Sequence, residues 1–319
     1  MLTSKQIKEI ALAAGADACG IAPMSRFNGA PDEMNPQFLF PEAKSCIGFV
    51  FRIPRGVQRG IEEGTQFYQY PSMAYGGINE IFAPAVLYQV GKYIEDEGYE
   101  AFVYRNTGAR GVVSDMDGSP GNTLSPEEQI EINENAKTST AHHRSVQFTR
   151  PTRENNVAPD LQFQFRLAAV VCGLGEMGLN GKIIAKNHGP YMRYAFIITD
   201  APLDTDEPLT ETLCDKCGAC ITACPGNAIS EKGLDTWQCG VYYKGAHKSN
   251  PFMTDEFLKD HPERDAILNG EKRFDAESAR EIYKEMKFLP NTQSGYAPCL
   301  CGKKCDIACY NHLKEIGKI

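Results

Sequence analysis

The stretch CDKCGACITACP, residues 214–225, contains four cysteines in the spacing C-x2-C-x2-C-x3-C with a proline directly after them. Thiolates at this spacing bind [4Fe–4S] clusters, and the fourth cysteine of the run ligates the other cluster of a two-cluster protein. Cys214, Cys217 and Cys220 are therefore expected to bind one cluster. Zinc is the alternative metal, but structural zinc sites usually show paired C-x2-C spacings. The stretch favours iron–sulfur chemistry.

A second set of cysteines follows later, as a two-cluster protein requires. Cys239 stands alone in DTWQCGVYY (235–243), and PCLCGKKCDIACY (298–310) contains the last four cysteines. A pseudo-symmetric pairing gives the first cluster Cys214, Cys217, Cys220 and Cys309. It gives the second cluster Cys224, Cys239, Cys301 and Cys305. Cys299 is left over, although it could replace Cys301 as a ligand.

The composition is that of a globular protein whose cysteines are reduced. The chain has 319 residues, a formal net charge of −8 and 12 cysteines, nine of them after residue 213. It shows neither a signal peptide nor an apolar run of membrane-spanning length, so we expect a cytoplasmic protein without disulfides. Its acidity disfavours a nucleic-acid partner. The remaining cysteines, which lie singly in apolar runs, are expected to be buried: Cys19, Cys46 and Cys172.

The rest of the chain indicates an α/β or α+β architecture. Helices are expected at 3–15 and 78–97, and strands at 18–22, 45–51 and 100–105. Residues 106–159 are polar and broken by glycine and proline, which predicts a long insertion that serves as a lid or binding loop. The acidic, proline-bearing segment at 203–212 indicates a linker. The predicted domains are 1–205 and 206–319.

The segment VVCGLGEMGLNG, residues 170–181, carries Gly173, Gly175 and Gly178 in the spacing G-x-G-x-x-G. The apolar run LAAVVC before it resembles a strand, and Asp200 closes a later apolar run. This order is typical of a dinucleotide-binding unit. Such a fingerprint normally follows the first strand of its domain, however, and this one comes late. The position favours a different large cofactor close to the backbone of these glycines.

Several motifs together resemble one superfamily, the cobalamin-dependent epoxyqueuosine reductases and reductive dehalogenases. The matching pieces are CGLGEMGLNG (172–181), YAFIITDAPL (194–203), CDKCGACITACP (214–225), TWQCGVYY (236–243) and CGKKCDIACYNHL (301–313). AGADACGIAPM (14–24) matches the family's first strands less specifically. The terminal spacing C-x3-C-x3-C departs from the C-x2-C-x3-C of the epoxyqueuosine enzymes. The resemblance does not cover residues 106–159.

The resemblance implies a nitroreductase-like domain that binds cobalamin, followed by a ferredoxin-like domain with two [4Fe–4S] clusters. The corrinoid is held base-off in this family, and the sequence lacks the D-x-H-x-x-G motif that supplies a histidine to cobalt elsewhere. Gly173, Gly175 and Gly178 would lie against the corrinoid. Asp160 matches the family's proton donor with an offset of one residue. Dehalogenases use a tyrosine instead, for which Tyr68, Tyr70, Tyr75 and Tyr104 are all candidates.

Three functions are compatible with these features. The first is a cytoplasmic, anaerobic corrinoid-dependent reductase that receives electrons from a low-potential donor such as ferredoxin or flavodoxin and reduces a small organic substrate. A tRNA substrate stays as an alternative that the net charge of −8 disfavours. The second is an electron-transfer protein that reduces a partner's corrinoid or another acceptor. The third is a nicotinamide or flavin reductase joined to a ferredoxin-like domain.

Overall fold

The computed structural model describes residues 2–105, 161, 163–286, 288 and 299–319. The chain divides into two compact units, each assembled from several stretches. Unit 1 comprises Met1–Phe49, Ala85–Gly173 and Tyr194–Pro208, and unit 2 comprises Val50–Pro84, Leu174–Arg193 and Leu209–Ile319. The predicted insertion at 106–159 lies outside the described residues. The domain boundary at residue 205 stays a prediction.

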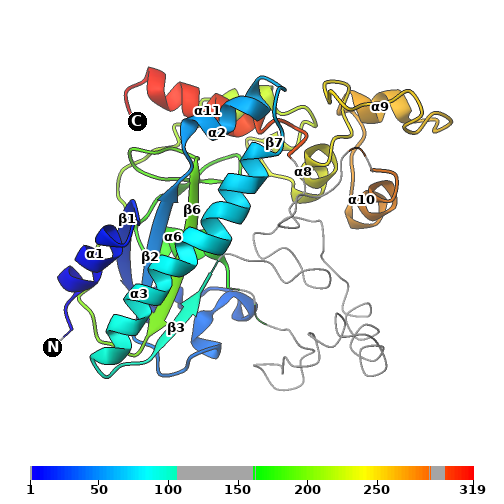
Figure 1. Ribbon diagram of the computed structural model, residues 1–319. Coiled ribbons are helices and arrows are strands. Elements are labelled where there is room, and N and C mark those ends of the chain that lie inside the picture. Colours follow the sequence, from blue (N-terminus) through cyan, green and yellow to red (C-terminus); the bar gives the residue numbers. More distant parts are fainter. Residues whose placement is uncertain (1, 106–160, 162, 287, 289–298) are drawn as a thin grey trace. The chain divides into compact units, whose positions relative to one another are not determined.

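Unit 1 is built on a four-stranded sheet with the order β1-β2-β6-β3 (Figure 1). The strands are β1 (Ala18–Pro23), β2 (Ser45–Arg52), β3 (Ala101–Tyr104) and β6 (Met192–Thr199). Strand β3 pairs antiparallel with β6, from Ala101 opposite Thr199 to Tyr104 opposite Phe196. Seven of the eight residues of β2 are buried, which explains its almost continuous apolar sequence.

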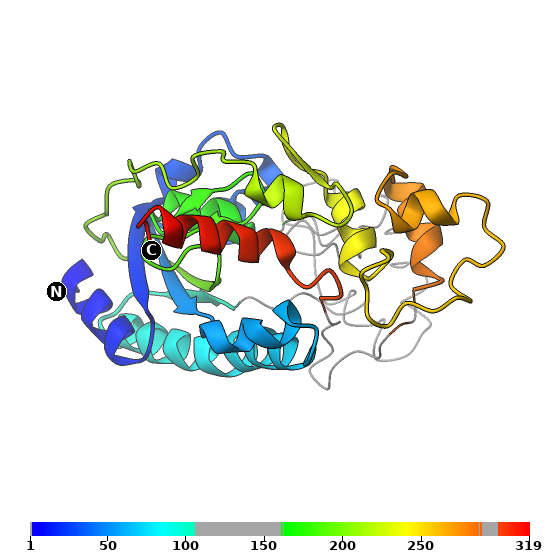
Figure 2. The ribbon, with the colours of Figure 1, turned by 90° about the horizontal axis from the view of Figure 1, so that it is seen from above.

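Helices pack on this sheet through small and apolar residues. Helix α1 (Ser4–Ala13) begins at Thr3, whose hydroxyl accepts from the amide of Gln6 in a capping box. Helix α3 (Ala83–Asp96) lies along one face of the sheet (Figures 1 and 2). Gly91 permits this approach, since a Cβ there would lie 3.0 Å from Cγ1 of Val103. The unit also contains η1 (Met24–Phe27), η2 (Asp32–Met34), η3 (Pro36–Phe38) and α6 (Phe165–Val171).

Unit 2 consists of short helices and two small hairpins. The hairpins pair β4 (Glu176–Met177) with β5 (Ile183–Ile184), and β7 (Ile229–Ser230) with β8 (Gly233–Leu234). The helices are α2 (Arg55–Glu62), the π-helix η4 (Tyr70–Phe82), α7 (Ala219–Ala223), α8 (Thr236–Tyr243), α9 (Arg264–Leu268), α10 (Ala276–Tyr283) and α11 (Lys304–Glu315). A core of Val241, Tyr242, Phe257, Ile267 and Phe274 joins α8, α9 and α10.

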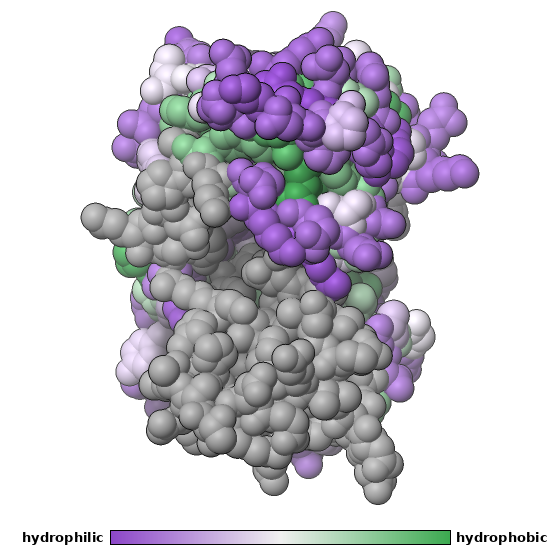
Figure 3. Space-filling model, turned by 90° about the vertical axis from the view of Figure 1, so that its right-hand side faces the viewer, coloured by the Kyte–Doolittle hydropathy of each residue, from purple (hydrophilic) through white to green (hydrophobic). Residues whose placement is uncertain are grey.

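Polar side chains predominate on one face of the described surface (Figure 3). On the face drawn in Figure 3, the described side chains are mostly hydrophilic, and apolar side chains show in a recess between them. Among the residues that the structure describes, every helix is too short or too polar to cross a bilayer.

The mixed α/β architecture is confirmed, and so are the predicted first helix and the first three strands. The expected helix at 78–97 is instead the end of η4 followed by α3. The strand predicted for LAAVVC is wrong, because this run lies in α6 and its end. A short apolar run is compatible with a buried helix as well as a strand, and here Phe165, Ala168, Ala169 and Val171 are buried with helical spacing.

Candidate iron–sulfur centre

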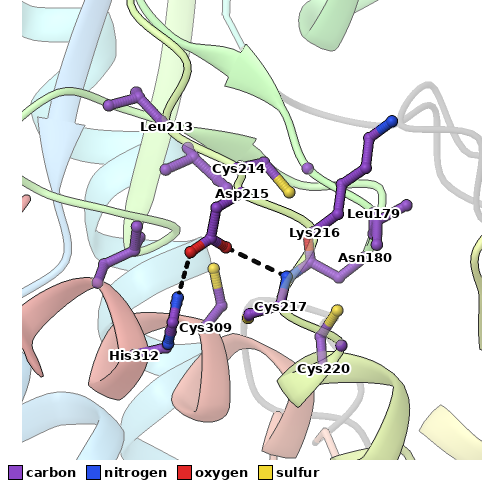
Figure 4. Close-up of a pocket in the computed structure, with 14 residues that line it drawn as sticks. Leu179, Asn180, Leu213, Cys214, Asp215, Lys216, Cys217, Cys220, Cys309 and His312 are labelled. Atoms are coloured by element: carbon purple, nitrogen blue, oxygen red, sulfur yellow. Dashed lines mark hydrogen bonds and ion pairs between the residues drawn. The ribbon is translucent and has the colours of Figure 1, made fainter. Parts of the chain in front are cut away.

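Four cysteines lie around one pocket of unit 2 (Figure 4). Cys214 and Cys217 belong to the loop before α7, Cys220 lies in α7, and Cys309 comes from α11. Helices α7 and α11 are in contact, which brings Cys309 to a loop almost a hundred residues earlier in the chain. The pocket thus gathers all four cysteines predicted for the first cluster.

The loop that carries these cysteines turns sharply and is held by two carboxylates. Lys216 and Gly218 have positive φ values of 59° and 79°, and the second of these favours glycine. Glu176 of β4 accepts hydrogen bonds from the backbone amides of Leu213 (2.5 Å) and Cys214 (3.0 Å). Asp215 accepts one from the amide of Cys217 at 3.2 Å. The carboxylates therefore fix the backbone on both sides of Cys214.

Asp215 also contacts His312 of α11, as Figure 4 shows. Nε2 of His312 lies 2.7 Å from the second carboxylate oxygen, and this hydrogen bond lowers the pKa of Asp215. The thiol of Cys217 joins them, since the potential ligand atoms of the three residues lie within 4.8 Å of one another. This group is chemically able to hold a metal ion, and it shares Cys217 with the cysteine pocket.

Burial raises the pKa of two thiols of the pocket, those of Cys220 and Cys309. Desolvation raises the pKa of Cys220, and the neighbouring thiols of Cys214 and Cys217 raise it further. Burial and the carboxylate of Asp306 raise the pKa of Cys309 in the same way. Because metals bind thiolates, occupation of this site has to release protons.

The cysteines predicted for the second cluster also influence one another. Cys224 ends α7, with its sulfur accepting from the amide of Ala228 at 3.3 Å, and Cys239 lies in α8. Desolvation raises the pKa of Cys239 to about 11 and that of Cys301 to about 12, and neighbouring thiols of this group contribute to both shifts. The pKa of Cys305 is raised mainly by burial and Asp306. Cys224, Cys239, Cys301 and Cys305 therefore form a second thiol group, in which Cys224 is half-buried.

A buried ion pair lies among these cysteines. Lys303 and Asp306 are only 4% and 3% exposed, and the ammonium nitrogen lies 3.6 Å from Oδ2 of the carboxylate. Asp306 also accepts from the side-chain amide of Asn180 at 3.3 Å and from the thiol of Cys305 at 3.6 Å. The pair belongs to the segment that joins Cys301 to Cys309, so its charges lie close to both cysteine groups.

Cys299 faces a cluster of tyrosines instead. Its thiol donates to the hydroxyl of Tyr243 at 2.7 Å, and that hydroxyl lies 3.2 Å from the hydroxyl of Tyr75. Arg193 lies 3.8 Å above the ring of Tyr75 and also contacts the hydroxyl of Tyr70. Two of the four candidate tyrosines thus meet beside Cys299.

The predicted cofactor residues outside the cysteine groups have other surroundings. A β-hairpin follows Gly175 instead of the helix of a dinucleotide site. A Cβ at Gly175 would lie 2.5 Å from Cγ2 of Ile183 and from the carbonyl oxygen of Ile184, so the hairpin itself requires this glycine. Gly178 lines the cysteine pocket, and Gly173 has a φ of 69°. Asp160 lies outside the described residues.

Replacement of Gly175 by alanine is therefore expected to lower the free energy of unfolding by about 1–3 kcal/mol through overpacking. Gly56→Ala is the matched control, because Gly56 lies in α2 with open space around its Cα and should tolerate the change. Urea denaturation of the protein without metal, followed by circular dichroism, measures both. Equal effects of the two substitutions would contradict the packing role of Gly175.

Sequence reasoning missed the charged residues of this centre. Glu176 lies inside the glycine motif, and Lys303 and Asp306 lie between cysteines, where a charge is usually solvated. Only the position of Asp306, next to Cys305 in the terminal cysteine segment, offered a local signal.

Comparison with known proteins agrees with the chemistry of these residues. A family model described as "4Fe-4S binding domain" matches residues 208–230. An epoxyqueuosine reductase of Vibrio cholerae is 41% identical over 78 residues, which are 24% of this chain and 21% of the relative. A tetrachloroethene reductive dehalogenase of Desulfitobacterium hafniense is 42% identical over 67 residues, 20% of this chain and 12% of the relative. A solved epoxyqueuosine reductase from Streptococcus thermophilus has a TM-score of 0.45 and 16% identity over 82% of this chain and 62% of that one.

The chain contains a 4Fe–4S binding domain, at the residues where the cysteine run predicted it. A segment of the chain is similar to epoxyqueuosine reductases and reductive dehalogenases, which confirms the resemblance seen in its motifs. The relatives so named are oxidoreductases. The matched segment spans about a fifth of the length of the first epoxyqueuosine reductases.

Proposed function

We propose that the chain is an iron–sulfur, corrinoid-dependent reductase that passes electrons from two [4Fe–4S] clusters to base-off cobalamin and on to a small organic substrate. The observation that carries this proposal is the gathering of Cys214, Cys217, Cys220 and Cys309 around one pocket. This group and the second thiol group together supply the eight thiolates that two such clusters need. A low-potential donor such as ferredoxin or flavodoxin would supply the electrons.

The donor sets fit the proposed clusters. Each group offers four sulfur atoms, which suits [4Fe–4S] clusters. When bound, such clusters supply one-electron transfer at low potential. The protein's own residues hold the ligand loop through Glu176 and Asp215, and the buried pair of Lys303 and Asp306 lies beside Cys305.

The corrinoid part of the proposal rests on the superfamily relationship. The packing of Gly175 against its own hairpin explains that glycine without a cofactor. The nitroreductase-like arrangement, the contact of Gly173, Gly175 and Gly178 with a corrinoid, and Asp160 as proton donor stay proposals. The cytoplasmic location and a tRNA substrate also stay open to test.

Metal analysis after anaerobic purification tests the proposal. We expect about eight irons and a similar amount of sulfide per chain, as two [4Fe–4S] clusters require. Titration with cobalamin should then change its visible spectrum. About four irons per chain would contradict the two-cluster assignment, and zinc in place of iron would contradict both clusters.

A second candidate is an electron-transfer protein that reduces a partner's corrinoid or another acceptor. The family model favours this candidate because the segment that it matches, residues 208–230, is a 4Fe–4S binding segment. Eight irons without any uptake of cobalamin would support this candidate. The nicotinamide or flavin reductase has less support, because α6 and the β4–β5 hairpin replace the strand and helix around the glycines.

A further inference from the structure

The two cysteine groups have different charged residues beside them. A cluster that takes up one electron becomes one charge more negative, so a fixed positive charge nearby favours reduction and a negative one opposes it. Reduction potentials of iron–sulfur clusters depend on such charges and on hydrogen bonds to sulfur. Buried charges act most strongly, because water and salt screen the exposed ones.

The first group has a carboxylate at its ligand loop. Glu176 is half-buried and accepts from the amides of Leu213 and Cys214. Its negative charge is thus held against the backbone of a proposed ligand. Those two amide hydrogens also point to a carboxylate and not to sulfur. Asp215 and Lys216 carry opposite charges in the same loop, but both are exposed and therefore screened.

The second group has a buried ammonium group. Lys303 lies two residues from both Cys301 and Cys305 and is 4% exposed. Its ammonium nitrogen is paired with Asp306, whose carboxylate also accepts from the thiol of Cys305, so the positive charge lies near that sulfur.

Asp306 does not cancel this difference. It offsets part of the charge of Lys303, whose ammonium nitrogen lies 3.6 Å away, so the second group has a paired charge. The carboxylate of Glu176 at the first group is held by backbone amides instead, and this difference is the contrast between the two groups.

We propose that the chain holds its two clusters at different reduction potentials, with Lys303 raising the potential of the second cluster and Glu176 lowering that of the first. This inference rests on the proposed function, since both clusters must be bound. Its consequence is an order of filling: the first electron given to the oxidised protein resides on the cluster of Cys224, Cys239, Cys301 and Cys305.

A redox titration of the reconstituted protein, monitored by electron paramagnetic resonance, tests this inference. Cys309→Ser removes a proposed ligand of the first cluster and so identifies its signal. In Lys303→Met we expect the ratio of reduced to oxidised second cluster at a fixed potential to fall at least tenfold, about 59 mV for a one-electron couple. Glu176→Gln should raise that ratio for the first cluster alone.

Matched variants distinguish the effect of a removed charge from the effect of a disrupted structure. Lys304 is the exposed neighbour of Lys303, and Glu211 is an exposed glutamate paired with Lys186 at 3.2 Å, so Lys304→Met and Glu211→Gln should leave both midpoints unchanged. Lys303→Arg keeps the charge and should keep the midpoint. If Lys303→Met does not bind its clusters, the midpoint potential of the first cluster in Glu176→Gln still tests the inference.

The outcomes separate the two proposals. Shifts of both midpoints together, shifts of opposite sign, or changes below tenfold in a protein with about eight irons would overturn the inference but not the proposed clusters. A wild-type protein without cluster signals would instead overturn the proposed function itself.

Discussion

Replacement of Cys309 by serine is expected to halve the iron bound to the protein, from about eight to about four atoms per chain. Cys309 is the only thiol that α11 contributes to the pocket of Cys214, Cys217 and Cys220. Serine is a poor ligand for iron, and a [4Fe–4S] cluster needs four thiolates. Cys301→Ser should have the same effect, because Cys301 belongs to the second group of buried thiols. Iron and sulfide analysis after anaerobic reconstitution measures both.

The double variant Cys301→Ser/Cys309→Ser decides whether the two cysteines belong to different clusters. If they do, almost no iron remains, whereas two ligands of one cluster would leave about four atoms per chain. Cys299→Ser is the matched control in the same segment. The thiol of Cys299 donates to the hydroxyl of Tyr243, and a serine hydroxyl can also donate, so this variant should keep all of its iron. Loss of four irons in Cys299→Ser, with none lost in Cys301→Ser, would make Cys299 the ligand.

The spacing of the cysteines predicted this centre well because metal ligation imposes short, recognisable intervals. Cys214, Cys217 and Cys220 lie in one turn of loop and helix, and local geometry alone brings them together. The run is typical of two-cluster proteins, and this predicted that Cys309 would join the first three cysteines. In the structure Cys309 lines the same pocket. The assignment of these residues as ligands stays a prediction.

The charges of the centre could not be predicted from local patterns. Glu176 reaches the amide of Cys214 across 38 positions of sequence, and such a contact leaves no periodic signal. Burial of Lys303 depends on how η4, α8 and α11 pack within unit 2, which no single segment encodes. The wrong strand prediction for LAAVVC has a related cause. A short apolar run indicates that a segment is buried but does not distinguish a helix from a strand.

Replacement of Asp306 by asparagine in the metal-free protein is expected to lower the free energy of unfolding by about 3–5 kcal/mol. The change leaves the ammonium of Lys303 buried without the carboxylate 3.6 Å away. Lys303→Met leaves the carboxylate of Asp306 buried without its partner and should lower the free energy of unfolding by a similar amount. The double variant Lys303→Met/Asp306→Asn buries neither charge, so its loss should be far smaller than the sum. Guanidinium denaturation of the four proteins measures this coupling, and additive losses would contradict it.

Cluster binding should make the losses in the free energy of unfolding unequal for the two single variants, Asp306→Asn and Lys303→Met. In the metal-free protein the pKa values of Cys301 and Cys305 are raised by burial, so these thiols are neutral near pH 7 and Asp306 is the close anionic partner of Lys303. Iron binding turns the thiols into thiolates, which give Lys303 additional negative neighbours and Asp306 additional repulsion. Asp306→Asn should therefore cost less in the reconstituted protein than in the metal-free one, and Lys303→Met more. The same denaturation under anaerobic conditions checks the reversal, and equal costs in both forms would show that the second thiol group binds no anionic cluster beside Lys303.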